Sequence, residues 1–317
     1  MLKFVALAAA LFASPLSAAA QVADAPPPPL RSAKSWGYQL QNVEPATLAQ
    51  SPYDLFVLDY SRDGSQDGAL TPDDLRKLKV KPDGSRRIVL SYFSIGEAEK
   101  YRYYWRWYWG WLFGWLGPEW LGKQNREWGG NYGVRYWNED WQKIIFRGED
   151  SYLDRIMNAG FDGVYLDKVD EYEDMRAEKP DARALMTALV KAIGDKARAR
   201  KPGFFIVPQN GEGLLTDAGY RAAIDGLGKE DLLYGELKDR RPNDPKSIAR
   251  NVAWLKLLTA DGKPVFAVEY LNRPAEIERA RQELLDYGFV PHFADRKLEA
   301  MRIGDFPDRV PARQRRQ

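Results

Sequence analysis

The chain has 317 residues, a formal net charge of +2, one histidine and no cysteine. The lack of cysteine excludes disulfides, thiolate nucleophiles and thiolate metal sites, and a single histidine argues against a histidine-dependent triad or a multi-histidine metal centre. The balanced charge gives no electrostatic reason to expect nucleic acid as a partner.

The first twenty residues are typical of a secretory signal. Lys3 precedes an apolar run, and the small residues at 18–20 fit a cleavage site. The alternative is an uncleaved anchor, although the apolar run is short for a hydrocarbon layer of ~30 Å. We therefore expect an exported protein, periplasmic or extracellular, without stable membrane insertion after signal removal. Residues 1–20 are predicted to be the signal peptide and residues 21–35 a Pro-rich linker.

From Trp36 onward, short apolar runs alternate with amphipathic helical patterns, which indicates β/α repetition and a parallel sheet. A run at 133–137 is assigned to a long insertion after the third strand. Eight other runs are predicted to be barrel strands. These are residues 37–41, 54–60, 87–94, 162–167, 203–210, 222–230, 264–270 and 289–294.

Helices are predicted between the strands from their caps and periodicity. Thr71 followed by Pro72 marks the start of one helix. Three more are predicted at 182–201, 245–262 and 274–288. The pattern predicts an α/β fold, a (β/α)8 TIM barrel over residues 36–300, with a shortened last helix and a polar, basic tail over 301–317.

Carboxylates interrupt the apolar pattern at the carboxyl ends of four predicted strands, at Asp59, Asp167, Glu230 and Glu269. The helix-facing side of a barrel strand is apolar, so strand periodicity directs these groups toward the barrel mouth. Any one of them could be a cap or a solvated loop charge. Four carboxylates at the same barrel mouth favour a functional site there.

Glycoside hydrolysis needs two carboxylates, one protonated and one ionised. The strands that end at Asp167 and Glu230 have one strand between them, which places their backbones ~10 Å apart at ~4.8 Å per strand. That separation is compatible with either a retaining or an inverting mechanism. No phosphate-binding motif follows a strand, and residues 171–174 lack calcium-loop spacing, so neither a cofactor nor a metal is predicted.

The strings SYFSIGEAE (91–99), GFDGVYLDKVD (160–170) and LGKED (227–231) resemble glycoside hydrolase family 114, and the resemblance extends over residues 36–294. The characterised activity of that family is endo-α-1,4-polygalactosaminidase. The resemblance implies a polysaccharide substrate, Asp167 as nucleophile or stabilising carboxylate, and Glu230 as general acid/base. The candidate substrate-binding residues are Asp59, Tyr92, Glu97, Tyr165, Asp170, Asn210, Glu269 and Tyr270.

De-N-acetylated galactosamine is cationic, so an acidic mouth would favour it, unless several of its acids are loop charges paired with Lys168 or Lys229. We expect an endo-acting glycosidase on α-1,4-linked galactosamine-containing polysaccharide. One alternative is a catalytically inactive carbohydrate-binding barrel in exopolysaccharide assembly. Another is a membrane-surface protein that uses its aromatic insertion as an interfacial anchor.

The aromatic insertion begins with YRYYWRWYWGWLFGWLGPEW at 101–120. A membrane-spanning role is excluded because Arg102, Arg106 and Glu119 interrupt the stretch. Its rings are predicted either to stack on sugars or amines, to pack on one another as a lid, or to contact a membrane surface or partner.

Overall fold

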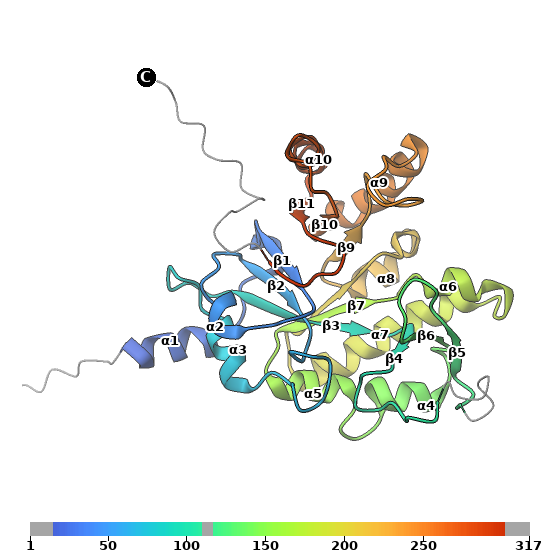
Figure 1. Cartoon of the computed structure of the whole chain (residues 1–317), viewed down its shortest axis with the longest axis horizontal. Helices are drawn as coiled ribbons and strands as arrows, with labels where there is room; N and C mark the ends of the chain where they lie inside the picture. Colours follow the sequence, from blue (N-terminus) through green and yellow to red (C-terminus); the bar gives the residue numbers. More distant parts are fainter. Residues whose placement is uncertain (1–14, 110–116, 302–317) are drawn as a thin grey trace, which may run out of the picture.

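The computed structural model describes residues 15–109 and 117–301, and it forms a (β/α)8 barrel, as predicted. Figure 1 shows the strands gathered centrally with helices around them. Eight parallel strands follow the order β1-β2-β3-β7-β8-β9-β10-β11. They are β1 (Trp36–Gln39), β2 (Leu55–Leu58), β3 (Ile88–Ser94), β7 (Gly163–Asp167), β8 (Phe205–Pro208), β9 (Leu227–Glu230), β10 (Val265–Glu269) and β11 (Val290–Phe293).

Two junctions connect the five-stranded and three-stranded parts of the barrel. A parallel bridge between Gln209 and Gly228 joins the β8 edge to β9. At the other junction, the Trp36 indole N–H of β1 donates to the Val290 carbonyl of β11 at 3.0 Å. Inward-pointing side chains therefore come from all eight strands. The carboxyl ends of the strands share one rim.

The helices lie outside the barrel, and their starts agree with the capping patterns of the sequence. Thr71 accepts from the Asp74 N–H, and Asp74 accepts from the Thr71 N–H, which is a complete capping box. The helices are α1 (Pro15–Asp24), α2 (Pro45–Leu48), α3 (Pro72–Leu78), α4 (Glu139–Gln142), α5 (Tyr152–Ala159), α6 (Glu171–Asp174), α7 (Ala182–Arg200), α8 (Ala218–Ala223), α9 (Pro245–Ala260) and α10 (Pro274–Asp286).

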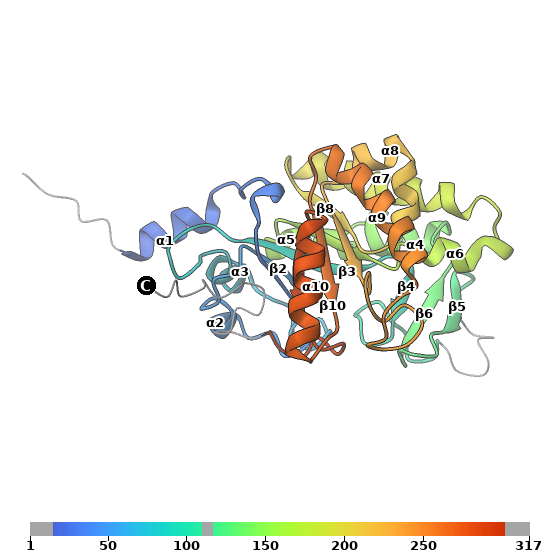
Figure 2. The same ribbon diagram turned by 90° about the horizontal axis from the view of Figure 1, so that it is seen from above.

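The predicted insertion after the third strand carries a small antiparallel sheet of its own. Its order is β4 (Glu97–Glu99), β6 (Asn131–Val134) and β5 (Leu121–Gln124). In both views this sheet lies with α4 and α6 at one end of the molecule, while α1, α2 and α3 lie at the other (Figures 1 and 2). The run at 133–137 thus lies partly in β6, outside the barrel.

The segment before β1 packs on the barrel. Ala23 and Leu30 are 2% and 4% exposed, so part of the expected linker is buried. Residues 1–14 of the predicted signal and 302–317 of the predicted tail lie outside the described residues. Between Pro15 and Met301, within the ranges given above, no helix is long and apolar enough to cross a membrane.

The barrel interior is filled by alternate residues of the strands. Trp36, Tyr38 and Tyr165 form an aromatic layer with ring centroids 5.3–6.2 Å apart. Gly228 lies against this layer, and a Cβ placed there would be 1.8 Å from the Tyr165 hydroxyl oxygen. The aromatic layer therefore requires glycine at position 228.

We expect Gly228→Ala to lower the free energy of unfolding by about 1–3 kcal/mol, because the added methyl overpacks the interior. Chemical denaturation measures the change. Gly129→Ala is the matched control, since the nearest atom to its new Cβ is 3.8 Å away. Both variants replace glycine by alanine, so both change the entropy of the unfolded chain in the same way. Equal stabilities of the two variants would contradict the packing argument.

Candidate active site

A cavity of about 750 Å³ opens at the carboxyl ends of the strands. This is the face on which barrel enzymes hold their active sites. Eight of the ten predicted site residues line the cavity. They are Asp59, Tyr92, Glu97, Asp167, Asp170, Asn210, Glu230 and Tyr270.

Asp167, the last residue of β7, is held in the cavity by two donors. The Tyr92 hydroxyl donates to its Oδ2 at 2.7 Å, and the Lys168 N–H donates to its Oδ1 at 2.7 Å. Burial raises the pKa of Asp167 above its usual range, while these two donors and the Lys168 charge act in the opposite direction. Asp167 is thus oriented by bonds that favour its ionised form.

Glu230, the last residue of β9, is held by donors from the residues directly after β8 and β10. Gln209 and Asn210 donate to its Oε2, the latter at 3.4 Å, and the Tyr270 hydroxyl donates to its Oε1. Burial, and next the negative charge of Asp167, raise the pKa of Glu230 to about 7. The mouth therefore holds two interacting carboxyl groups, one of which retains its proton near neutral pH.

The backbone turns sharply after three neighbouring strands. Lys168, Asn210 and Asp231 have φ values of 59°, 58° and 51°, in the left-handed region. Lys168 and Asp231 directly follow the two carboxyl residues Asp167 and Glu230. Asn210 directly follows Gln209, which donates to Glu230. Left-handed geometry at a non-glycine residue costs of order 1–3 kcal/mol, and such residues occur at functional sites. Here the turns end β7, β8 and β9 at the cavity floor.

Two further carboxyl groups line the cavity beside Lys168. Glu97 accepts from the Asn125 side chain at 2.8 Å and lies 3.5 Å from the Lys168 ammonium. Asp170 makes no side-chain hydrogen bond within the described part of the chain, and burial raises its pKa to about 6. Asp170 is therefore available to a ligand.

Asp59 lines the cavity, but its carboxylate forms an internal ion pair. The Arg102 guanidinium binds both of its carboxylate oxygens, at 2.8 and 2.6 Å, and also binds Glu99 at 2.6 Å. The Arg102 side chain is fully buried. This arginine comes from the aromatic insertion, so the ion pairs fix the start of that insertion to the end of β2.

Two predicted substrate-binding residues do not line the cavity. Tyr165 is fully buried in the aromatic layer. Glu269 is also fully buried, and it accepts from the N–H groups of Leu233 and Tyr234 at 2.8 and 3.2 Å. Burial raises its pKa to about 8. Glu269 braces the loop after β9 because its side chain points away from the barrel interior.

Three residues that shape the site were not predicted. Tyr38 donates to Gln209 at 3.0 Å, which orients the amide that binds Glu230. Arg296 lies over the Tyr270 ring at 4.4 Å and lines the cavity. The polar residues after β8 could have indicated Gln209. No local sequence pattern predicts that Arg296, which lies beyond β11, lines the cavity.

The aromatic stretch is divided between packing and the cavity wall. The Trp120 ring packs between Trp109 and Trp141, with centroid distances of 5.1 and 4.8 Å, and this row of rings continues into the core. Tyr101 lines the cavity, together with Trp128 from later in the insertion. Residues 110–116 lie outside the described residues. Self-packing therefore accounts for part of the stretch.

A (β/α)8 barrel with a large polar cavity at the carboxyl ends of its strands has the architecture of a barrel enzyme. Comparison with known families gives the class: the chain belongs to the glycoside-hydrolase family GH114, which it matches over residues 15–308. The resemblance seen in the sequence is thereby confirmed, and the protein is a glycoside hydrolase by family.

The chain is also similar to curated relatives in sequence and to a solved structure in fold. An uncharacterized protein of Thermotoga maritima is 34% identical over 278 residues, covering 84% of this chain and 81% of the relative. Protein MJ1477 of Methanocaldococcus jannaschii is 36% identical over 282 residues, covering 84% and 77%. The glycoside hydrolase domain of PelA from Pseudomonas aeruginosa shares the fold, with a TM-score of 0.62, 17% identity, and coverage of 85% of this chain and 97% of the domain.

We expect Arg102→Met to destabilise the protein by about 3–5 kcal/mol, because it leaves buried carboxylates without their counter-charge. Thermal or denaturant unfolding measures the loss. Arg106→Met is the control, since Arg106 lies in the same stretch and is exposed. A similar, small effect of both substitutions would show that the buried ion pairs do not hold the insertion.

Proposed function

We propose that the protein is an exported endo-glycosidase, secreted or periplasmic, that cleaves α-1,4-linked galactosamine-containing polysaccharide with Asp167 and Glu230. The observation that carries the proposal is the pair of oriented carboxyl groups in the cavity of a GH114 barrel, with the pKa of Glu230 raised to about 7. Two carboxyl groups with separated roles are the requirement for glycosidic cleavage.

Glu230 is suited to be the general acid. A carboxyl group whose pKa lies near neutrality keeps a proton at working pH and can give it to the departing glycosidic oxygen. Gln209, after β8, and Tyr270, after β10, hold its two oxygens from the two sides of β9, so the carboxyl plane is fixed before substrate binds. After cleavage, the same group in its ionised form can take the proton of an incoming water.

Asp167 is suited to be the nucleophile or the stabilising carboxylate. Tyr92 and the Lys168 N–H both donate to it, which favours the anion. The anion then faces the positive charge that develops at the anomeric carbon. Its negative charge also contributes to the raised pKa of Glu230, so the two roles support each other.

The charge of the cavity favours a cationic sugar. Eight acidic side chains line it against four basic ones. Some of the acids are neutralised, as Asp59 is by Arg102, but Asp170 forms no ion pair within 4.0 Å in the described part of the chain. A protonated galactosamine would therefore be attracted to the mouth.

We expect Asp167→Asn and Glu230→Gln each to lower kcat by about 10²–10⁴-fold, because each removes a proton-transferring or charge-stabilising group. Reducing-end release from α-1,4-linked galactosamine oligomers measures the rate. Asp195→Asn, on the exposed surface of α7, is the control and should keep full activity.

Full activity in both active-site variants would rule out this carboxylate pair. If the wild-type protein bound the oligomers and released no reducing ends, the alternative of an inactive carbohydrate-binding barrel would replace the enzyme. Unfolding curves of each variant establish that the loss of rate is not a loss of fold.

The rate should fall as pH rises through about 7, because Glu230 then loses the proton that it donates. The Tyr270 hydroxyl stabilises ionised Glu230 and so lowers its pKa. Tyr270→Phe should raise that pKa and move the alkaline limb of the kcat/KM profile to higher pH. Tyr220→Phe, at a buried hydroxyl without a partner in the described structure, should leave the limb in place. A shift to lower pH in Tyr270→Phe would contradict the assignment.

A further inference from the structure

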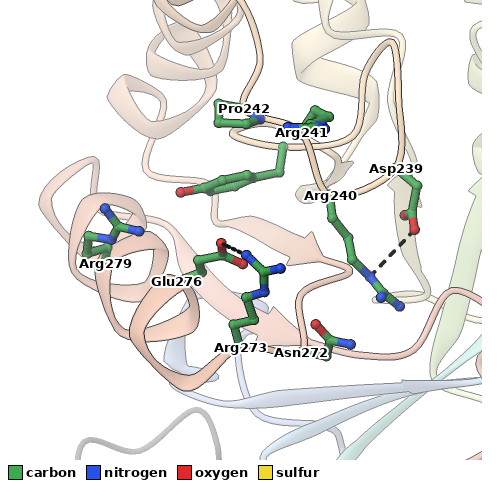
Figure 3. A pocket seen from close by; sticks show the side chains of 9 residues that line it. Asp239, Arg240, Arg241, Pro242, Asn272, Arg273, Glu276 and Arg279 are labelled. Carbon is green, nitrogen blue, oxygen red and sulfur yellow. Dashed lines mark hydrogen bonds and ion pairs between the residues drawn. The ribbon is translucent and has the colours of Figure 1, made fainter.

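A second cavity, of about 510 Å³, lies outside the catalytic one, between the loop after β9 and the start of α10 (Figure 3). Its walls are polar, and four of its side chains are arginines. The residues that line it are Tyr234, Asp239, Arg240, Arg241, Pro242, Asn272, Arg273, Glu276 and Arg279. We call it the arginine pocket.

The arginine pocket carries an excess of positive charge. Two of its arginines face carboxylates, since Arg240 lies 3.5 Å from Asp239 and Arg273 lies 3.2 Å from Glu276. Figure 3 shows these two pairs on either side of the pocket. Arg241 and Arg279 have no carboxylate within 4.0 Å among the residues that the structure describes. Two guanidinium groups are therefore left without an internal counter-charge.

The loop that forms one wall is braced from behind. An antiparallel bridge joins Tyr234 to Pro242, and the Gly235 N–H donates to the Arg241 carbonyl at 2.9 Å. Buried Glu269 accepts from the Tyr234 N–H at 3.2 Å. The pocket is thus framed by a hydrogen-bonded hairpin that is anchored to β10. Binding a ligand would not require this wall to be ordered first.

A salt-bridge wall separates the arginine pocket from the catalytic cavity. Arg296 lines the catalytic cavity and binds Asp231 at 2.9 Å and Asp239 at 3.1 Å. Asp239 in turn lines the arginine pocket. The two cavities therefore share one rim but have opposite charge, acidic at the carboxylate pair and basic here.

We propose that the arginine pocket binds an acidic sugar unit, whose carboxylate or phosphate oxygens pair with Arg241 and Arg279. Guanidinium groups bind such oxyanions through paired, charge-assisted hydrogen bonds. Half-buried Tyr234 offers an aromatic surface to the ring, and Asn272 a neutral polar group for hydroxyls. The volume falls within the range of small-molecule pockets.

A nucleic acid fits this surface less well than a sugar. Polynucleotide binding needs basic side chains spread along several phosphates. Here the excess charge is confined to one hollow, and the whole chain has a formal charge of only +2. A discrete anionic unit with a ring to pack on Tyr234 matches the pocket better.

The test is titration calorimetry of the full protein at low ionic strength with trigalacturonate, galactose 1-phosphate, inorganic phosphate and neutral galactotriose. Saturable binding of an acidic sugar, tighter than phosphate and absent for the neutral sugar, is expected. Preference for the uronate identifies a carboxylate ligand, and preference for the sugar phosphate identifies a phosphate ligand. Binding does not depend on catalysis, so the result is independent of the proposed hydrolysis.

The double variant Arg241→Gln/Arg279→Gln should weaken this binding about 10-fold per arginine removed. The control Arg76→Gln/Lys191→Gln removes the same charge from exposed positions on α3 and α7 and should bind normally. Unchanged binding by the first variant, equal loss in the control, no saturable binding of either acidic sugar, or tighter binding of a short single-stranded DNA would each overturn the proposal.

Discussion

The burial of two carboxyl groups at one barrel mouth is the constraint on which the rest of the site depends. Removing Glu230 from water next to Asp167 raises its pKa to about 7, because the charged form loses solvation and meets a like charge. A raised folded-state pKa means that the folded protein holds this proton more tightly than the unfolded chain. The resulting stability is present at acidic pH and is lost as pH rises through about 7. Hydrogen bonds from Gln209 and Tyr270 offset part of this cost and orient the carboxyl group.

The loops at the mouth are held by charged groups that are bound to partners within the protein. Arg102 ties the aromatic insertion to β2 through Asp59, and Glu269 ties the loop after β9 to β10. Arg296 links that same loop to the segment after β11. These interactions are long-range in sequence, so they form only when the barrel forms. They explain why some acidic residues at strand ends, such as Asp59 and Glu269, hold loops in place while Asp167 and Glu230 face the cavity.

Strand periodicity predicted the barrel and directed four strand-end carboxylates toward its mouth, but it did not tell which face of β10 is inside. The sequence pattern around Glu269 places it opposite Phe266 and Val268, and an apolar helix-facing side predicts that those two face the helices. In the structure both pack in the barrel interior with Tyr165. Glu269 therefore points outward, whereas its neighbour Tyr270 points into the cavity. Glu230 does point into the cavity, because Leu227 faces the outer layer. An apolar side chain is equally stable on either face of a barrel strand, so alternation alone cannot decide the direction.

The sequence by itself determined the eight strands, the capped helices, the insertion after the third strand and the strand ends at which Asp167 and Glu230 lie. These features are local, since they depend on periodicity, turn residues and caps within short windows. Only the tertiary structure decided which acids share the cavity, which of them are neutralised by arginine, and where the arginine pocket forms. Those outcomes depend on contacts between residues far apart in the chain, such as Asp59 with Arg102 and Asp231 with Arg296, and on the desolvation that only the closed barrel produces.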